Sequence, residues 1–499
     1  MLFRSIWSTA LEPFRNSDRT SHRVVYQTMT NEGTWLGEVG YRTPNGAWLL
    51  KSKLPTSIDA MNETDMPALL FLRERDMLES LQEAVHWEEH QGTIRVLNAG
   101  RVDGLYEESS HPWSTNLMLC NAKLKSGTSN ASRNDQDDEY GSQPQPSLSD
   151  RDYHLIVAAD GMNSTLRGIY GGHETDARRI IGTSTLASPI DLPANFSDAK
   201  YMSTVRDWNK SQHQEIVGLQ DRQYTVFRGN ANLSRKDLYN DPSNPSYQTW
   251  GTGKSMRFAT VPMMCPTPQG REERQVWFIT IDNDALVKES DPVKRRDMLL
   301  NEFKDWHEPI QRTVMATPAE EILIERAVAH RHCTGPVLAF NTKVVRRLRG
   351  RHPPSSGEGP CVVFIGDSYM TVDPILAQGF TCAMESGAAL HHSVSRSYLD
   401  FMERPTNATR NELDPQLAFD PIRLRQELKD RQTSKMDRLI CLLRVTELVQ
   451  ALGQPNAKWT GVFNTILLRP LMRFTPNFIK APIFDAVLKY SLGLRKSKT

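Results

Sequence analysis

Cysteine is scarce in this chain, with six in 499 residues, and no two of them are spaced as Cys-x-x-Cys. The spacing argues against zinc-ribbon and thioredoxin-like sites, and so few thiols in so long a chain do not form a disulfide scaffold. An excess of charge of one sign is also lacking, because 60 basic and 59 acidic residues leave a net charge of +1. This balance excludes a globally basic protein that binds nucleic acid through its phosphates.

Long hydrophobic runs are absent as well, and the mean hydropathy is −0.51. No uncharged apolar stretch reaches the ~18 residues that a transmembrane helix needs, so none is expected. The first 15 residues lack the apolar core and cleavage site of a secretory signal. At ~150 residues per domain, the length predicts two to four domains with a substantial core.

The order of the segments predicts a mixed α/β chain. Residues 125–150 are almost free of apolar side chains and predict a surface loop or disordered insertion. Residues 215–281 read as antiparallel strands, because apolar runs alternate with polar breakers. Helices are expected at 292–315, 380–402, 421–452 and 459–494.

Two segments carry candidate chemistry, and the first is a strand that ends in Asp-Gly. The apolar run 153–159 is followed by Asp160, Gly161, Ser164 and Arg167. Glycine suits a tight turn at which the backbone approaches a ligand, and Ser164 is a candidate N-cap of a following helix. Taken alone, the segment predicts either a ligand-binding turn or a plain strand–turn–helix connection.

The second segment is a buried strand, 361–365, that ends in Gly-Asp. A carboxylate at the C-terminal edge of such a strand can accept a hydrogen bond from a ribose hydroxyl. A proline then stiffens the loop, and the N-terminus of the next helix favours an anionic group. A core strand–loop–helix without a ligand is the alternative. The candidate positions are Gly366, Asp367, Pro374, Ala377, Gln378 and Gly379.

In this order, the two segments resemble the Asp-Gly and Gly-Asp motifs of FAD-dependent monooxygenases with the para-hydroxybenzoate hydroxylase fold. The resemblance implies that the residues named in both segments bind FAD. Residues 72–81 resemble the family's Arg-x-x-Leu helix, whose arginine reaches the cofactor, which implies Arg75 or, as a second choice, Arg73. The resemblance covers roughly residues 1–400 and is specific for flavin binding rather than for a substrate.

The sequence departs from the family in two places. The GxGxxG turn that holds the ADP pyrophosphate occurs nowhere in the chain, and Ile6–Leu11 resembles a helix that comes later in that domain. Either the sequence starts inside the cofactor domain, which is the explanation we favour, or the chain has lost the element. Ala377 stands where the family has a glycine, and its methyl group restricts positive φ.

The implied architecture is an α/β fold with a Rossmann-like FAD-binding domain, incomplete at its N-terminus, an inserted antiparallel-sheet substrate domain and a helical C-terminal region. We assign residues 1–190 and 336–400 to the FAD-binding domain, 191–335 to the substrate domain and 401–499 to the helical region. The candidate substrate-lining residues on the sheet are Phe227, Arg228, Phe258, Met263 and Trp277, although most apolar strand positions are simply core.

The implied activity is hydroxylation or epoxidation of an aromatic or isoprenoid-like small molecule through a flavin hydroperoxide, with NAD(P)H as electron donor and O2 as oxidant. A reductase or halogenase on the same fold is one alternative. A non-catalytic relative that serves as an interaction subunit is another, and the missing GxGxxG supports it. The sequence singles out no catalytic acid or base and no metal site.

The C-terminal tail is strongly basic. Between Lys458 and Thr499 there are eight basic residues and one acid, Asp485. Its apolar positions form one helical stripe. The segment therefore predicts either peripheral contact with an anionic membrane or a cap helix packed on the flavin domain. The stripe consists of Ile479, Ile483, Phe484, Val487 and Leu488.

Overall fold

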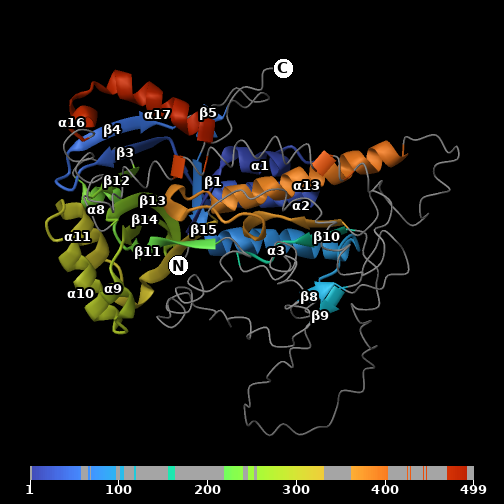
Figure 1. Cartoon of the computed structure of the whole chain (residues 1–499), viewed down its shortest axis with the longest axis horizontal. Coiled ribbons are helices and arrows are strands. Elements are labelled where there is room, and N and C mark those ends of the chain that lie inside the picture. The colour runs from blue at the N-terminus through green and yellow to red at the C-terminus, as the bar shows by residue number, and fades with distance from the viewer. Residues whose placement is uncertain are drawn as a thin grey trace, which may run out of the picture.

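A computed structural model of the chain describes residues 3–54, 56–57, 66–67, 69–96, 102–105, 117–119, 155–162, 219–239, 246–251, 255–330, 361–402, 424, 427–428, 442, 445–446 and 469–491. These residues form a large mixed sheet, several small sheets and helices packed in layers (Figure 1). The predicted α/β class is therefore confirmed. Ser164, Arg167 and the segment 125–150 lie outside the described residues.

The largest element is a seven-stranded sheet. Its neighbouring strands are antiparallel except for the parallel pair β12 and β3. The strands expected within 215–281 are confirmed, but β3 and β4 come from the segment assigned to the FAD-binding domain. The order is β15 (Leu323–His330), β11 (Leu219–Ala231), β14 (Gly270–Ile281), β13 (Arg257–Thr267), β12 (Ser246–Trp250), β3 (Glu38–Arg42) and β4 (Trp48–Lys53).

One face of this sheet is covered by α10 (Pro292–Glu302) and α11 (Glu308–Met315). Apolar side chains from strands and helices, including Phe258 and Phe303, form the core between them. The single helical segment expected over 292–315 is wrong in this respect, because the chain turns between the two helices. Pro309 lies in the first turn of α11, where proline favours the start of a helix rather than its continuation.

The opposite face packs on a three-stranded antiparallel sheet of β1 (Phe3–Trp7), β7 (Leu69–Arg73) and β2 (Thr34–Leu36). Ile6 lies in β1, so the expectation that a helix spans Ile6–Leu11 is wrong for its first two residues. A further apolar cluster joins this sheet to a helical layer. The layer consists of α1 (Ser8–Arg15), α2 (Thr20–Glu32), α3 (Glu74–His90) and α13 (Gly379–Met402).

A separate parallel pair is formed by β10 (Leu155–Ala158) and β16 (Cys361–Phe364), and both of these strands were predicted. Two 3-10 turns, η3 (Gly366–Ser368) and η4 (Pro374–Leu376), connect β16 to α13. The predicted helix at 380–402 is confirmed by α13. Two short antiparallel pairs complete the described strands, namely β5 (Thr56–Ser57) with β6 (Met66–Pro67) and β8 (Val102–Leu105) with β9 (Leu117–Leu119).

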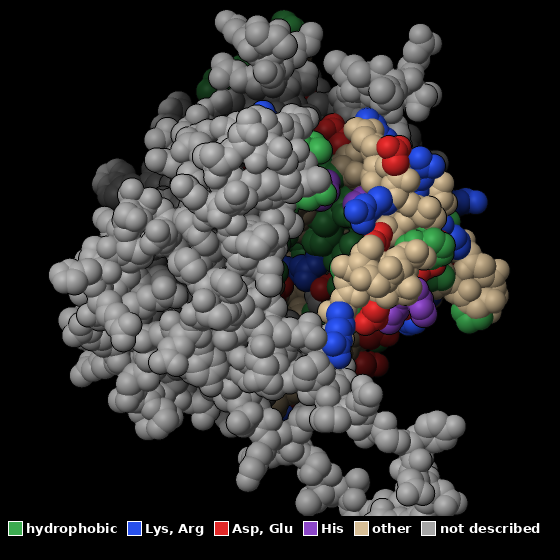
Figure 2. Space-filling view, turned by 90° about the vertical axis from the view of Figure 1, so that its right-hand side faces the viewer, with side chains coloured by type: hydrophobic (Ala, Val, Ile, Leu, Met, Phe, Trp, Pro, Cys, Tyr) green, Lys and Arg blue, Asp and Glu red, His purple; other side chains and the backbone are tan. Residues whose placement is uncertain are grey.

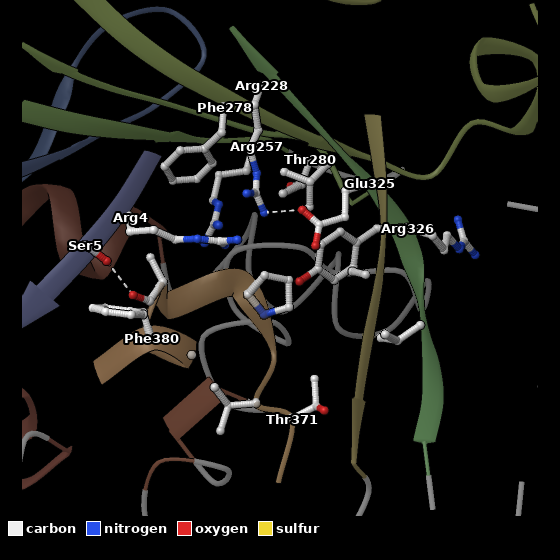
Figure 3. Close-up of a pocket in the computed structure, with 18 of the residues that line it drawn as sticks. Arg4, Ser5, Arg228, Arg257, Phe278, Thr280, Glu325, Arg326, Thr371 and Phe380 are labelled. Atoms are coloured by element: carbon white, nitrogen blue, oxygen red, sulfur yellow. Dashed lines mark hydrogen bonds and ion pairs between the residues drawn. The ribbon is translucent and has the colours of Figure 1, made fainter. Parts of the chain in front are cut away.

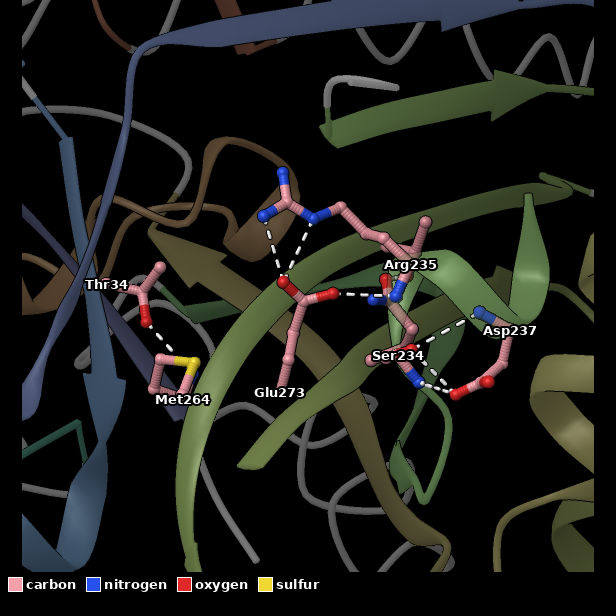
Figure 4. Close-up of polar contacts among 8 residues, drawn as sticks. Thr34, Ser234, Arg235, Asp237, Met264 and Glu273 are labelled. Carbon is pink, nitrogen blue, oxygen red and sulfur yellow. Dashed lines mark hydrogen bonds and ion pairs between the residues drawn. The ribbon is translucent and has the colours of Figure 1, made fainter. Parts of the chain in front are cut away.

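Local polar contacts fix the connections at one end of the large sheet (Figure 4). Ser234 and Asp237 form a reciprocal capping box at α8 (Arg235–Leu238), which satisfies free backbone N–H groups at the helix start. The guanidinium of Arg235 donates to Glu273 on β14 at 2.9 and 3.0 Å. The remaining short helices are α9 (Asp284–Lys288) and the 3-10 turn η2 (Ala319–Glu321).

At the C-terminal end, α16 (Arg469–Phe474) and α17 (Asn477–Ser491) lie against β4 (Figure 1). They are the described helices of the segment expected to be helical over 459–494. Among the described residues, no helix combines the length and the hydropathy that a membrane crossing requires.

Candidate functional site

The two sequence motifs meet at one edge of the parallel pair. In the register of this pair, Ala158 on β10 lies opposite Phe364 on β16. The Ala158 carbonyl accepts hydrogen bonds from the backbone N–H of Ile365 at 3.0 Å and from the hydroxyl of Ser368 at 2.6 Å. Because both strands run in the same direction, the turns that follow them, at Asp160 and at Asp367, lie at the same edge of the sheet.

A cavity of about 160 Å³ lies between this edge and the seven-stranded sheet. Met162 and Asp367 line it from the two motif turns, and strands β11, β13, β14 and β15 line it from the sheet. Figure 3 shows side chains from both sides pointing into this space. In the space-filling view, hydrophobic, basic and acidic side chains lie deep behind the described surface residues (Figure 2).

The loop between the two 3-10 turns and α13 is held in an unusual backbone conformation. Ala377 has φ +53°, in the left-handed region that side chains disfavour. Its carbonyl accepts a hydrogen bond from the hydroxyl of Ser5 on β1, and its N–H donates to the carbonyl of Pro374 at 2.9 Å. The expected restriction from the Ala377 methyl group is therefore overcome by these contacts. Pro374, Ala377 and Gly379 all line the cavity.

Two glycines and one buried glutamine in and next to this loop have features that suit a nearby ligand. Gly366 has φ +60°, and a Cβ there would come within 3.3 Å of Ala383, so a larger residue is disfavoured. Gly379 opens α13 toward the cavity, and an added Cβ would meet only Val372 at 4.0 Å. Gln378 is buried, and its Oε1 has no hydrogen-bond partner among the described residues.

A buried carboxylate, Asp373, joins the loop to the seven-stranded sheet. It accepts hydrogen bonds from Arg222 Nε at 2.6 Å, from the Tyr224 hydroxyl at 2.5 Å and from the backbone N–H of Ile375 at 2.9 Å. Burial, followed by the nearby Asp373 charge, raises the pKa of Tyr224 well above its ordinary value. This network fixes the position of the loop relative to the sheet.

Arg257 brings a buried positive charge to the cavity wall. Its side chain is 1% exposed, and its Nη1 donates to the carbonyl of Ile375 at 3.1 Å. Its Nε is buried without a hydrogen-bond partner, and burial lowers the pKa of its guanidinium. Within the described part of the chain, no carboxylate forms an ion pair with it. An anionic group in the cavity would therefore be favoured beside it.

The other basic groups around the cavity are paired. Arg228 binds Glu325 at 2.6 Å, and Arg4 binds Glu74 at 2.9 Å. Asp367 faces the cavity, and burial raises the pKa of its carboxyl group, while the Arg4 charge opposes this shift. The cavity therefore combines a partly desolvated carboxylate at the motif turn with a guanidinium on the sheet that has no ion-pair partner among the described residues, although the Asp373 charge acts on it.

Sequence reasoning placed Arg75 at the cofactor, but the structure turns it away from the cavity. Its side chain is 77% exposed and pairs with Glu79 one helical turn further on. Arg73 is only 13% exposed and pairs with Asp76, on the face of α3 that packs inward. Arg73 ends β7, whereas Arg75 lies in the first turn of α3, which begins at Glu74, and neither residue lines the cavity.

Of the five candidate substrate residues, two line the cavity and three do not. Arg228 and Trp277 are among its lining residues. The Trp277 side chain, however, is fully buried in the same core as Phe227 and Phe258, and its Nε1 donates to the Thr317 hydroxyl at 2.8 Å. Phe227 and Phe258 are fully buried in the core under α10 and α11, and Met263 is buried between the large sheet and β1. Tyr224 and Val226 on β11 line the cavity. Because side chains alternate between the two faces of a strand, Phe227 lies on the opposite face.

Sequence reasoning also missed Ser5, Tyr224, Arg257 and Asp373. The first three lie on strands far apart in the sequence, and their convergence depends on the sheet order rather than on any motif. Asp373 directly precedes Pro374 in the recognised loop. One sequence signal could have indicated Arg257. It directly precedes Phe258 in a strand, and because successive side chains of a strand point to opposite faces, the two residues lie on different sides of the sheet.

The described residues fit the flavin part of FAD. Gly379 lines the cavity with open space at its Cα, and next to it in the chain Gln378 has a buried Oε1 without a hydrogen-bond partner among the described residues. Asp160 and Asp367 follow the two parallel strands at their shared edge, where carboxylates could accept hydrogen bonds from ribose or ribityl hydroxyls. A GxGxxG turn for the pyrophosphate is not present in the sequence.

Comparison with solved structures assigns the fold. The chain is similar to HpxO from Klebsiella pneumoniae, solved with FAD and uric acid, at 13% identity and a TM-score of 0.55, covering 98% of this chain and 88% of that one. It is also similar to CtdE, solved with FAD and a substrate, at 11% identity and a TM-score of 0.52, covering 98% and 87%.

The likeness to these flavoproteins shows that the chain has the fold of FAD-dependent monooxygenases of the para-hydroxybenzoate hydroxylase type. A point variant of HpxO with FAD matches at 13% identity and a TM-score of 0.54, over 99% of this chain and 91% of that one. No protein-family profile matches the chain, and no curated protein matches it by sequence.

Proposed function

We propose that this protein is an FAD-dependent monooxygenase that hydroxylates or epoxidises a small molecule. The observation that carries the proposal is the meeting of the Asp160 and Asp367 turns at the carboxyl edge of β10 and β16, next to a cavity that the seven-stranded sheet closes. A flavin ring beside the 374–379 loop would then face a substrate held against the sheet.

The residues that would bind FAD form two groups according to their position in the fold. Asp160, Gly161, Gly366 and Asp367 lie at the turns that follow the two parallel strands, where ribose or ribityl hydroxyls can be bound. Backbone groups at 377–379 and the start of α13 would meet the flavin ring. The first-turn N–H groups of α13 would stabilise negative charge there, because they carry the positive end of the helix dipole. Ser164 and Arg167 stay predicted members of the same set, as does the division into domains at residues 190, 335 and 400.

When bound, FAD supplies the redox and oxygen chemistry, with NAD(P)H as the proposed electron donor and O2 as the oxidant. The chain's own part is to position FAD and the substrate and to exclude water from the cavity. Asp373, Arg222 and Tyr224 hold the loop against the sheet, and apolar side chains such as Phe278 and Phe380 line the cavity. A dry, fixed cavity favours transfer of oxygen to the substrate over its loss to water.

The charge of the cavity refines the substrate class. Arg257 is buried without a carboxylate partner in the described part of the chain, and it faces a space that is lined mainly by apolar side chains. We infer that the substrate is an aromatic or isoprenoid-like molecule that carries an acidic group, such as a carboxylate or a phenolate, bound by Arg257. The guanidinium would orient the apolar part of the substrate toward the loop.

The proposal is tested by adding FAD to the purified chain and following the quenching of flavin fluorescence. We expect saturable binding, followed by substrate-stimulated oxidation of NADH or NADPH under O2. Saturable binding without any such oxidation, across a panel of acidic aromatic compounds, would favour a reductase or halogenase on this fold. Absence of FAD binding would favour the non-catalytic interaction subunit.

A further inference from the structure

The outward face of the C-terminal helices is apolar, which is unusual for a helix at the surface of a protein. On α16, Leu471 and Phe474 are 60% and 79% exposed. On α17, Phe478 and Ile483 are 77% and 63% exposed, and Ile479 is 45% exposed. Scattered exposed apolar side chains are normal, but here they are contiguous.

The exposed positions of α17 follow the period of the helix. Residues 478, 482 and 486 lie one turn apart, and so do 479, 483 and 487, so the six share one face. Every one of them is exposed and apolar. We call this face, together with Leu471 and Phe474, the C-terminal apolar face. Its members on α17 are Phe478, Ile479, Pro482, Ile483, Ala486 and Val487.

The other side of α17 is occupied by the protein itself. The ring of Phe484 packs edge-on against Tyr41 on β3, with 5.2 Å between ring centroids. Lys480 Nζ donates to the carbonyl of Leu49 on β4. Phe484 was expected to share a stripe with Ile479 and Ile483, and the structure corrects this by turning it inward. The helix is thus anchored to the sheet, over which it lies in Figure 1. Its other side carries the exposed apolar positions.

The charged residues near the C-terminal apolar face indicate which kind of partner it binds. Residues 469–499 contain seven basic residues and a single acid, Asp485, which is half-buried in the structure. Arg473 is exposed next to Phe474, at 5.9 Å from its ring. An apolar helix face with the exposed Arg473 beside it, in a basic segment whose one acid is half-buried, matches the apolar and anionic layers of a lipid surface.

We propose that the C-terminal apolar face docks on an anionic membrane surface, with α16 and α17 lying in the plane of the lipid headgroups. The apolar side chains enter the boundary between headgroups and acyl chains, Arg473 contacts lipid phosphates, and the positive charge of the tail favours an anionic surface. Because Lys480 and Phe484 tie α17 to β3 and β4, docking brings the whole folded chain to the membrane. The proposal does not depend on catalysis.

Sedimentation of the full chain with vesicles tests this proposal. We expect binding to vesicles of phosphatidylcholine with phosphatidylserine, weaker binding to phosphatidylcholine alone, and a decrease in binding as salt rises. The double variant Phe478→Ser/Ile483→Ser should weaken binding about 10-fold or more, because two large apolar contacts are lost. Phe478→Leu/Ile483→Leu should keep most of it.

A matched control is Leu399→Ser on α13, since Leu399 is also apolar and 54% exposed but lies outside this face. It should bind vesicles like the unchanged chain, and circular dichroism should show that all variants remain folded. The proposal is overturned if the unchanged chain does not sediment with anionic vesicles, or if the Leu399 variant loses as much binding as the double variant. A dimer in size-exclusion chromatography that the double variant converts to monomer would assign the face to a second copy and overturn the membrane proposal.

Discussion

The hydroxyl of Ser368 donates a 2.6 Å hydrogen bond to the carbonyl of Ala158, although 210 positions separate the two residues. This bond ties the turn after β16 to the end of β10 and places both motif turns at one edge. Ser368→Ala should therefore lower the free energy of unfolding by about 1 kcal/mol and weaken FAD binding. Urea unfolding and flavin fluorescence give the two values. Ser397→Ala, at a buried serine further along α13, serves as a control that should leave FAD affinity unchanged.

The Asp373 network should be far more sensitive to substitution than an exposed ion pair. Asp373→Asn removes the charge that balances Arg222 in a buried setting, where breaking a pair costs about 3–5 kcal/mol. Arg75→Ala breaks an exposed, solvent-screened pair with Glu79 and should change stability far less. Thermal unfolding of both variants makes the comparison. Equal losses of stability would contradict the proposed role of the Asp373 network.

Much of the fold could be predicted from the sequence, because its strands, turns and helices follow local patterns of residues. The strands β10 and β16, the Gly-Asp turn η3 and helix α13 each have a short-range signature, and all are confirmed as elements. The polar part of the site was not accessible in this way, since Arg257 and Tyr224 come together only through the strand order β11-β14-β13. Arg75 is exposed and does not line the cavity, so its contact with FAD stays a prediction.

Replacing Ala377 by glycine should relieve the strain of its left-handed backbone conformation. Ala377→Gly removes the side chain from a left-handed conformation and should raise the free energy of unfolding by about 0.5–1 kcal/mol. Ala388→Gly in the middle of α13 should have the opposite sign, because glycine destabilises a helix interior by about 1 kcal/mol. Denaturant unfolding of the two variants side by side checks this. A loss of stability in both would show that the loop is not strained at Ala377.

His307 should make the fold sensitive to mild acid. Burial and the nearby Arg42 lower the pKa of this imidazole to about 4, and its Nε2 is 2.9 Å from the Thr249 hydroxyl. The unfolded chain takes up this proton near pH 6.5, whereas the folded chain resists it until about pH 4. Stability should therefore be unaffected above pH 6.5 and fall by up to about 3 kcal/mol as the pH drops toward 4.

His307→Gln should remove this part of the acid sensitivity, and His86→Gln should not, since His86 has a side chain that is 73% exposed. Unfolding free energies measured across this pH range distinguish the two variants. The account of His307 fails if the unchanged chain and His307→Gln lose stability in parallel between pH 6.5 and 4.

The affinity for FAD of the unchanged chain, of Asp160→Ala, of Asp367→Ala and of the double variant tests the central claim most directly. If the two turns hold one cofactor, the unchanged chain binds FAD, each single variant binds it at least about 10-fold more weakly, and the two losses are not additive, as expected for groups that share one ligand. Full FAD affinity in both single variants, or no FAD binding by the unchanged chain, would contradict the claim.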